Sequence, residues 1–287
     1  MLSKMFTMIG FPRYASVYDA GADMARLKEL HRTVMDPTRI SSISAVLAEL
    51  ETIGARMPAD ATEAWGELHY IRGVLSFRAG RANESLASGI EALRIDITCP
   101  FLSEKERSLF NYNLASQAED VGKWDVAIDA YRRVIPSFEA DPGRAEDQRL
   151  GTRERLAFCL HKAGKYAEAF ALNEEVLAKA EKLFGPDSEK LLVVVTSLVQ
   201  NAYKLNQPDV ARTFLERRLS IATKHMNIGH MDASFFQLGM LCAEQGRTEE
   251  AKTFVQRRLQ LARRSGDIDR IEDAEEDLEL LRAGIGC

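Results

Sequence analysis

The sequence repeats itself about every 42 residues, and this period constrains its fold more than any other feature. Each copy has one residue that favours a turn: Gly80, Gly122, Gly164, Asn206 and Gly246, in steps of 42, 42, 42 and 40 residues. Five positions after each anchor stands a small residue: Ser85, Ala127, Ala169, Ala211 and Ala251. Thirteen positions after each anchor stands an aliphatic residue: Leu93, Ile135, Leu177, Leu219 and Leu259. This phased agreement predicts five copies of one structural unit.

Each recurring position has a physical role in a hairpin of two helices. Glycine or asparagine suits the left-handed residue that ends the first helix. A small residue in the second helix lets the two helices approach closely, and the later aliphatic residue completes its buried stripe. Because one such hairpin cannot bury its own apolar face, neighbouring hairpins must stack on one another. We therefore predict a solenoid of helical hairpins.

The pattern resembles the tetratricopeptide repeat, in which a small pair, a glycine turn, an aromatic residue, an alanine and an apolar residue follow in order. Aromatic residues stand two positions after the anchor at Trp124 and Tyr166. The usual period of that family is about 34 residues, and the longer spacing here, with LFGPDSEKL at 183–191, resembles the kinesin-light-chain type. The resemblance covers residues 61–264. It implies an all-α fold: an α-α superhelix of about six helical hairpins plus a C-terminal capping helix.

We expect four segments along the chain. Residues 1–14 form a loose N-terminal segment, and residues 15–60 form an N-terminal helical hairpin without the repeat signature, as is common for terminal repeats. Residues 61–264 hold the five repeats, and the first copy departs most from the pattern, with Arg72, Ser85 and Gly89 at its phased positions. Residues 265–287 form a capping helix with an acidic face, which is either a solvated end or an acidic docking surface.

Composition narrows the classes of function. The formal net charge of -5 argues against a general nucleic-acid binder, which usually has a strongly basic face. No stretch approaches the roughly 20 apolar residues that a membrane span needs, and the first residues do not form a secretory signal. The cysteines Cys99, Cys159, Cys242 and Cys287 contain no C-x-x-C pair, so they predict neither a zinc site nor a disulfide scaffold. We expect a cytoplasmic protein with core thiols at Cys159 and Cys242.

The sequence has none of the common catalytic motifs, such as a P-loop, a Rossmann glycine pattern, H-E-x-x-H or G-x-S-x-G. His225 and His230 flank a turn at no recognised metal spacing. Cys159 and His161 lie two positions apart on one expected helix and so point to different faces. We therefore expect no enzyme activity, no catalytic residues, no cofactor and no metal.

Three pairs of arginines occur late in the second helices of their copies. They are Arg132-Arg133, Arg217-Arg218 and Arg257-Arg258. One interpretation is a solvated helix face with ion pairs, and the other is a basic ridge on the convex side that meets an acidic partner or nucleic-acid phosphate. The sequence leaves both open.

In repeats of this type the first helix of each hairpin lines a concave groove. Positions ten, six and three before each anchor, together with their helical neighbours, should face that groove. The expected partner-binding residues are Tyr70, Phe77, Tyr112, Asn113, Ser116, Arg155, Phe158, His161, Gln200, Tyr203, Phe236, Gln237 and Met240. Aromatic residues, Met and Arg are enriched at binding surfaces, and amide side chains can hydrogen-bond an extended peptide backbone.

The first functional hypothesis is an adaptor or scaffold that binds a peptide or an extended segment of a partner protein in this groove. A bacterial peptide-sensing regulator and a dedicated assembly chaperone are the alternatives. A sensor should compact on binding a short peptide, whereas a chaperone should co-purify with one client. Exposed apolar surface in an atypical terminal repeat could also support a homodimer.

Overall fold

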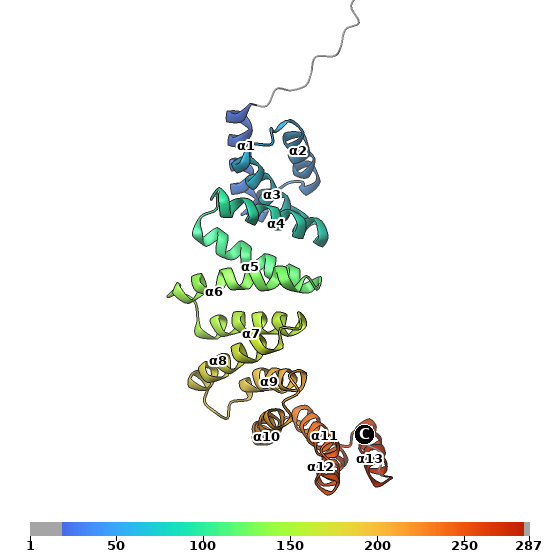
Figure 1. The fold of residues 1–287 in the computed structure, drawn as a ribbon. Helices are drawn as coiled ribbons and strands as arrows, with labels where there is room; N and C mark the ends of the chain where they lie inside the picture. Colours follow the sequence, from blue (N-terminus) through green and yellow to red (C-terminus); the bar gives the residue numbers. More distant parts are fainter. Residues whose placement is uncertain (1–18, 284–287) are drawn as a thin grey trace, which may run out of the picture. The chain divides into compact units, whose positions relative to one another are not determined.

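The computed structural model describes residues 19–283, so the expected loose segment 1–14 and Cys287 lie outside the described residues. Every regular element between residues 19 and 283 is helical, which confirms the all-α prediction (Figure 1). The described residues divide into two compact units, one ending at Val121 and the other beginning at Gly122.

Unit 1 holds the helices that precede Gly122. Its elements are α1 (Ala20–Val34), a short 3-10 helix η1 (Pro37–Arg39), α2 (Ile43–Arg56), α3 (Thr62–Arg78), α4 (Ala82–Thr98) and α5 (Glu104–Asp120). Helix α3 packs against α1, α2 and α4, and α4 packs against α5. The residues expected to form the N-terminal hairpin thus contain α1 and α2, and these helices cover α3.

Unit 2 holds the remaining helices. Its elements are α6 (Trp124–Ala140), α7 (Glu146–Lys162), α8 (Tyr166–Phe184), η2 (Glu189–Leu191), α9 (Leu192–Lys204), α10 (Pro208–Lys224), α11 (Ile228–Glu244), α12 (Thr248–Ser265) and α13 (Ile268–Arg282). Each of these α-helices packs against the next one along the chain. Within unit 2 the consecutive helices therefore form the stacked hairpins that the repeat predicts, and α13 packs on α12 after the last of them.

The anchor residues end the first helices in the predicted left-handed conformation. Gly80, Gly122, Gly164 and Gly246 have φ between 70° and 77°, and Asn206 has φ 55°. The turns close with the hydrogen bonds expected of such helix ends, for example from the Asn206 amide to the Tyr203 carbonyl at 3.0 Å. The prediction of five equivalent turns is confirmed.

The small residues of the second helices are buried, as the pattern predicts. The four alanines Ala127, Ala169, Ala211 and Ala251 are fully buried. In the first copy, the Ser85 hydroxyl lies 2.8 Å from the Gly73 carbonyl and 2.6 Å from Gln117 Oε1. In the first copy, Ser85 therefore replaces the apolar contact of the alanines with hydrogen bonds that connect α3, α4 and α5.

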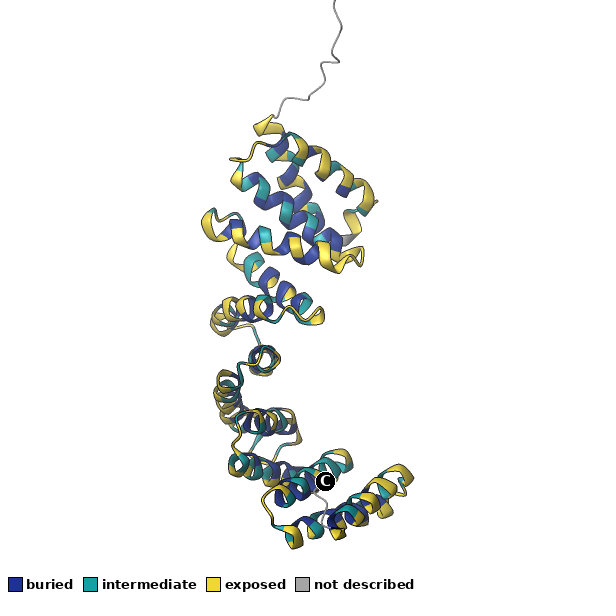
Figure 2. Cartoon of the chain, turned by 45° about the vertical axis from the view of Figure 1, so that its right-hand side comes forward, coloured by how far each residue is buried: buried dark blue, intermediate teal, exposed yellow. Residues whose placement is uncertain are grey.

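Within each unit, apolar side chains fill the space between consecutive helices, and Figure 2 shows buried residues along the faces that these helices turn toward one another. In unit 2, one cluster gathers Val176, Leu191, Val195 and Ile221 from α8, η2, α9 and α10. Cys159 and Cys242 are fully buried thiols, as expected. None of the described helices is both long and apolar enough to cross a lipid bilayer.

Candidate functional site

Helices α7, α9 and α11 are the first helices of three consecutive hairpins in unit 2, and hydrogen bonds connect them in order. His161 Nδ1 on α7 lies 2.7 Å from Asn201 Oδ1 on α9. The Tyr203 hydroxyl on α9 donates to the Gln237 carbonyl on α11 at 3.4 Å. These bonds place the three helices side by side. We call the surface made by Arg155, Phe158, His161, Val193, Gln200, Tyr203, Phe236, Gln237 and Met240 the first-helix face.

Three large apolar side chains on the first-helix face are exposed. Val193 is 62% exposed, Phe158 45% and Phe236 37%. The exposed amide of Gln200 stands on the same face of α9 as Val193, and Gln237 and Met240 are partly exposed on α11. The face therefore combines apolar surface with hydrogen-bonding amides, which are the two kinds of group that a peptide segment needs.

Two polar side chains of the first-helix face are held by contacts inside unit 2. Arg155 Nε donates to the Tyr131 hydroxyl on α6 at 2.6 Å. Burial, and secondarily the negative charge of Glu244, raise the pKa of Tyr203 to about 12. Tyr203 therefore stays a neutral hydrogen-bond donor across the physiological range.

The other predicted site residues lie in unit 1. Phe77 on α3 is 56% exposed, Asn113 on α5 is exposed, and Tyr112 and Ser116 on α5 are partly exposed. Tyr70 is different, because it is only 3% exposed. The structure thus places the thirteen predicted residues in two groups, five in unit 1 and eight in unit 2.

Tyr70 lies inside unit 1 because the atypical first hairpin covers α3. Its ring centroid lies 4.4 Å from that of His31 on α1 and 4.7 Å from that of Phe110 on α5. His31 Nδ1 in turn lies 2.5 Å from Glu67 Oε2, and its Nε2 lies 3.4 Å from Glu106 Oε1. Tyr70 is therefore part of a buried cluster that joins α1, α3 and α5.

The arginine pairs agree with the ion-paired interpretation in part, but two of the arginines are buried, which neither interpretation expected. Arg218 is 2% exposed and Arg258 is 7% exposed, so neither belongs to a solvated face or to a basic ridge. Arg132 and Arg217, by contrast, make ion pairs with Glu168 and Glu181, as the ion-paired interpretation predicts. The two buried arginines stand twelve positions after their anchors, where the second and third copies have valine.

Arg258 is neutralised by carboxylates on both neighbouring helices, α11 and α13. Its Nε lies 3.1 Å from Asp232 Oδ1 on α11, and its Nη1 lies 2.5 Å from Asp277 Oδ2 on α13. Asp273 of α13 lies 3.7 Å from its Nη2, and the guanidinium lies 5.0 Å from the centre of the Phe236 ring. This network fastens the capping helix α13 to the last hairpin.

Arg218 occupies the same repeat position but has different partners. Its Nε donates to Ser234 Oγ at 2.8 Å, and its Nη2 donates to Gln237 Oε1 at 2.6 Å. Burial lowers the pKa of Arg218, and no carboxylate among the described residues pairs with it. Sequence reasoning singled out this residue as one of a surface pair and missed its burial, although a charged residue at a position occupied by Val134 and Val176 in other copies was the available signal.

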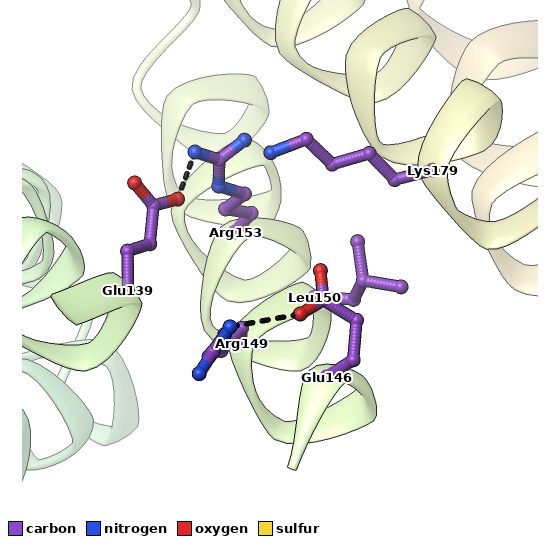
Figure 3. Close-up of a pocket in the computed structure, with 6 residues that line it drawn as sticks. All are labelled: Glu139, Glu146, Arg149, Leu150, Arg153 and Lys179. Carbon is purple, nitrogen blue, oxygen red and sulfur yellow. Dashed lines mark hydrogen bonds and ion pairs between the residues drawn. The ribbon is translucent and has the colours of Figure 1, made fainter. Parts of the chain in front are cut away.

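Two cavities lie away from the first-helix face. One, of about 180 Å³, lies between α6, α7 and α8 and is lined by Glu139, Glu146, Arg149, Leu150, Arg153 and Lys179 (Figure 3). Its arginines already have acidic partners, since Arg153 pairs with Glu139 and Arg149 with Glu146 at 3.1 Å. The other, of about 400 Å³, lies in unit 1 beside Trp65 and His69, whose rings stack 5.8 Å apart.

Comparison with known proteins agrees with this architecture. The family model of the tetratricopeptide repeat matches residues 148–224, which run from α7 to the end of α10. Residues 148–224 thus carry tetratricopeptide repeats, which confirms over this segment the repeat type identified from the sequence. No curated protein sequence matches the chain.

Several solved structures are similar to this chain at low sequence identity. Aspartyl phosphate phosphatase F from Bacillus subtilis is 11% identical with a TM-score of 0.51, and the match covers 93% of this chain and 80% of that one. Kinesin-light-chain TPR-like repeats from Podosopora anserina are 19% identical with a TM-score of 0.44, covering 70% and 97%. NprR in complex with its cognate peptide NprX is 17% identical with a TM-score of 0.40, covering 93% and 73%.

Proposed function

We propose that this chain is a binding module, and that the first-helix face of unit 2 holds an extended segment of a partner protein or a peptide. The observation that carries the proposal is the exposure of Phe158, Val193 and Phe236 on three neighbouring first helices. Patches of large exposed apolar side chains on a folded domain often mark sites of interaction with other proteins. Binding would remove their apolar area from water, which is favourable.

The hydrogen-bonding groups of the first-helix face favour an extended segment, whose main-chain groups are free to bond, as the bound partner. Gln200 and Gln237 can each offer both a donor and an acceptor to a main chain. Because the repeat places first helices at regular intervals, these amides recur along the face and could meet successive peptide groups. An adaptor role follows from this arrangement, and binding rather than catalysis is the proposed activity.

The test is an affinity purification of the tagged chain from its native lysate, read by mass spectrometry. The chain would be compared with the double variant Phe158→Ser/Val193→Ser. Ile268→Ser is the matched control, because Ile268 is 68% exposed on α13, outside the first-helix face. We expect one stoichiometric partner that the double variant loses and the control keeps. A partner that survives in the folded double variant would refute the assignment of this face.

The same experiment separates the alternatives. A short peptide that compacts the chain in small-angle scattering would indicate a sensor, and a client required for solubility would indicate a chaperone. We also propose a cytoplasmic location, since Cys99, Cys159 and Cys242 are free thiols, as is usual in reducing compartments. Fractionation of the source cells would test this location.

A further inference from the structure

Arg218 and Arg258 occupy equivalent positions in consecutive copies, and their surroundings can be compared atom by atom. The residue nineteen positions after each arginine comes from the next helix along the chain and contacts the guanidinium: Gln237 on α11 for Arg218 and Asp277 on α13 for Arg258. The equivalent residue is thus an amide that accepts from Nη2 in one copy and a carboxylate that accepts from Nη1 in the next. Asp232, the second acidic partner of Arg258, has Leu192 as its counterpart in the earlier copy.

The positive charge of Arg218 is therefore buried without neutralisation. Its two acceptors, Ser234 Oγ and Gln237 Oε1, are both uncharged. A buried ion that is hydrogen-bonded only to neutral groups is costly, and buried charges in proteins are usually paired with an opposite charge. The field of this charge reaches its neighbours, because burial and then Arg218 lower the pKa of His230.

One nitrogen of the guanidinium remains available. Nε and Nη2 have partners, whereas Nη1 donates to none of the described residues and is not among the described polar atoms that are enclosed without a partner. Nη1 is therefore left without an acceptor among the described residues, although Arg218 as a whole is buried. The guanidinium borders the first-helix face, because its Nη2 donates to Gln237, a residue of that face, and the Tyr203 hydroxyl bonds to the Gln237 carbonyl.

We propose that Arg218 is the receptor for a carboxylate of the bound segment, which takes the place that Asp277 holds at Arg258. This inference rests on the proposed function, and it specifies that the partner segment is acidic at this point. The carboxylate would accept from Nη1, and from Nη2 if Gln237 turns aside, as Arg forms two parallel bonds with a carboxylate. Either an aspartate or glutamate side chain or a free C-terminus could supply this group.

Three sets of immobilised octapeptide pools serve as the probe. The first set contains aspartate or glutamate and has amidated C-termini. The second set has asparagine or glutamine at those positions and amidated C-termini, and the third set has the same neutral side chains with free C-termini. We expect the chain to be retained at least about tenfold better by the first or the third set than by the second. The preferred set identifies the source of the carboxylate.

The decisive variant is Gln237→Glu, which supplies an internal carboxylate at the position of Asp277 without removing Arg218. We expect it to lose the preference for carboxylate-bearing pools and to raise the urea midpoint of unfolding at neutral pH. Gln256→Glu is the matched control, since it makes the same change on an exposed position of α12. Arg218→Gln should also lose the preference, and the gain in stability of Gln237→Glu keeps the test informative if Arg218→Gln does not fold.

The outcomes separate this inference from the proposed function. Equal retention by all three sets, abolished by Phe158→Ser/Val193→Ser, would overturn the carboxylate receptor and leave the proposed function standing. A carboxylate preference that persists in Gln237→Glu would also overturn it. Retention by no pool would count against both.

Discussion

Asp96 offers the sharpest test of how unit 1 holds together. It is 2% exposed at the end of α4, and its Oδ1 accepts from the amides of Phe101 and Leu102, each at 3.0 Å. Arg107 of α5 donates to both of its carboxylate oxygens. One side chain thus fixes the end of α4, the following loop and the start of α5.

Replacing Asp96 by Asn keeps the volume but removes the charge that these donors share. Breaking a buried ion pair costs about 3–5 kcal/mol, and the partial exposure of the Arg107 side chain, at 37%, reduces this through solvent screening. We expect Asp96→Asn to lower the free energy of unfolding of unit 1 by about 2 kcal/mol. The control Glu91→Gln breaks an exposed pair with Arg94 and should cost less than about 0.5 kcal/mol.

The effect should depend on pH in a defined direction. Burial raises the pKa of Asp96, but Arg107 and the two backbone amides outweigh it, so that this pKa lies below its usual value. The stabilisation is therefore complete above the unfolded-state pKa of about 3.9 and is lost as pH falls through the folded-state pKa. The difference between the native chain and Asp96→Asn should be constant from pH 7 to about pH 4.5 and shrink below pH 4.

Urea unfolding followed by tryptophan fluorescence measures this difference. The chain has two tryptophans, so a Trp124→Phe background leaves Trp65 as the reporter of unit 1. If Asp96→Asn behaves like Glu91→Gln, or if the difference stays unchanged down to pH 3, the account of this carboxylate is wrong.

Three further predictions concern backbone, packing and titration. Met226 has φ 54° and is 69% exposed, so Met226→Gly should raise the free energy of unfolding of unit 2 by about 0.5–1 kcal/mol. Asn206→Gly should change this free energy little, because asparagine tolerates the left-handed conformation. Urea unfolding compares the two variants, and equal effects would contradict the argument. Gly66→Ala would place a Cβ 2.6 Å from a phenylalanine ring carbon and should cost about 1–3 kcal/mol in thermal unfolding, so an unchanged midpoint would refute that packing. Burial raises the pKa of Tyr70 and of Tyr203 to about 12, and an absorbance titration of the folded chain should therefore include a late phase from these two side chains, in contrast to a single transition near pH 10.

The repeat made the turns and the helical phase predictable. Gly164 and Asn206 could be assigned because a left-handed helix end leaves few residue choices, and the phase of the exposed residues on α7, α9 and α11 follows from those ends. Tyr70 could not be placed in this way. Its burial depends on α1, a helix outside the repeat, and no periodic position in the sequence records which face of α3 that helix covers.

The buried arginines show a second limit of prediction from the sequence, because moving an arginine pair by one position within its copy decides whether one member is buried. Arg217 and Arg218 are adjacent, and only the residue twelve positions after the anchor points into the junction with the next helix. Arg132 and Arg133 stand one position earlier in their copy, where Val134 occupies the buried place. A pattern of paired charges favours a surface interpretation, and only the phase of each residue within its own copy reveals the exception.

The contact between Arg258 and Asp277 also has a consequence for building longer or shorter arrays from this chain. Where the arginine pairs with a carboxylate of the following helix, its charge is neutralised within the chain and the array can end there. At the junction of Arg218 and Gln237, the positive charge of the arginine has no carboxylate partner. The arginine and the residue nineteen positions after it would then decide whether each junction is charge-neutral, independently of the apolar core. Exchanging copies would therefore decide, at each junction, whether the buried arginine pairs with a carboxylate of the chain or keeps its charge for a ligand.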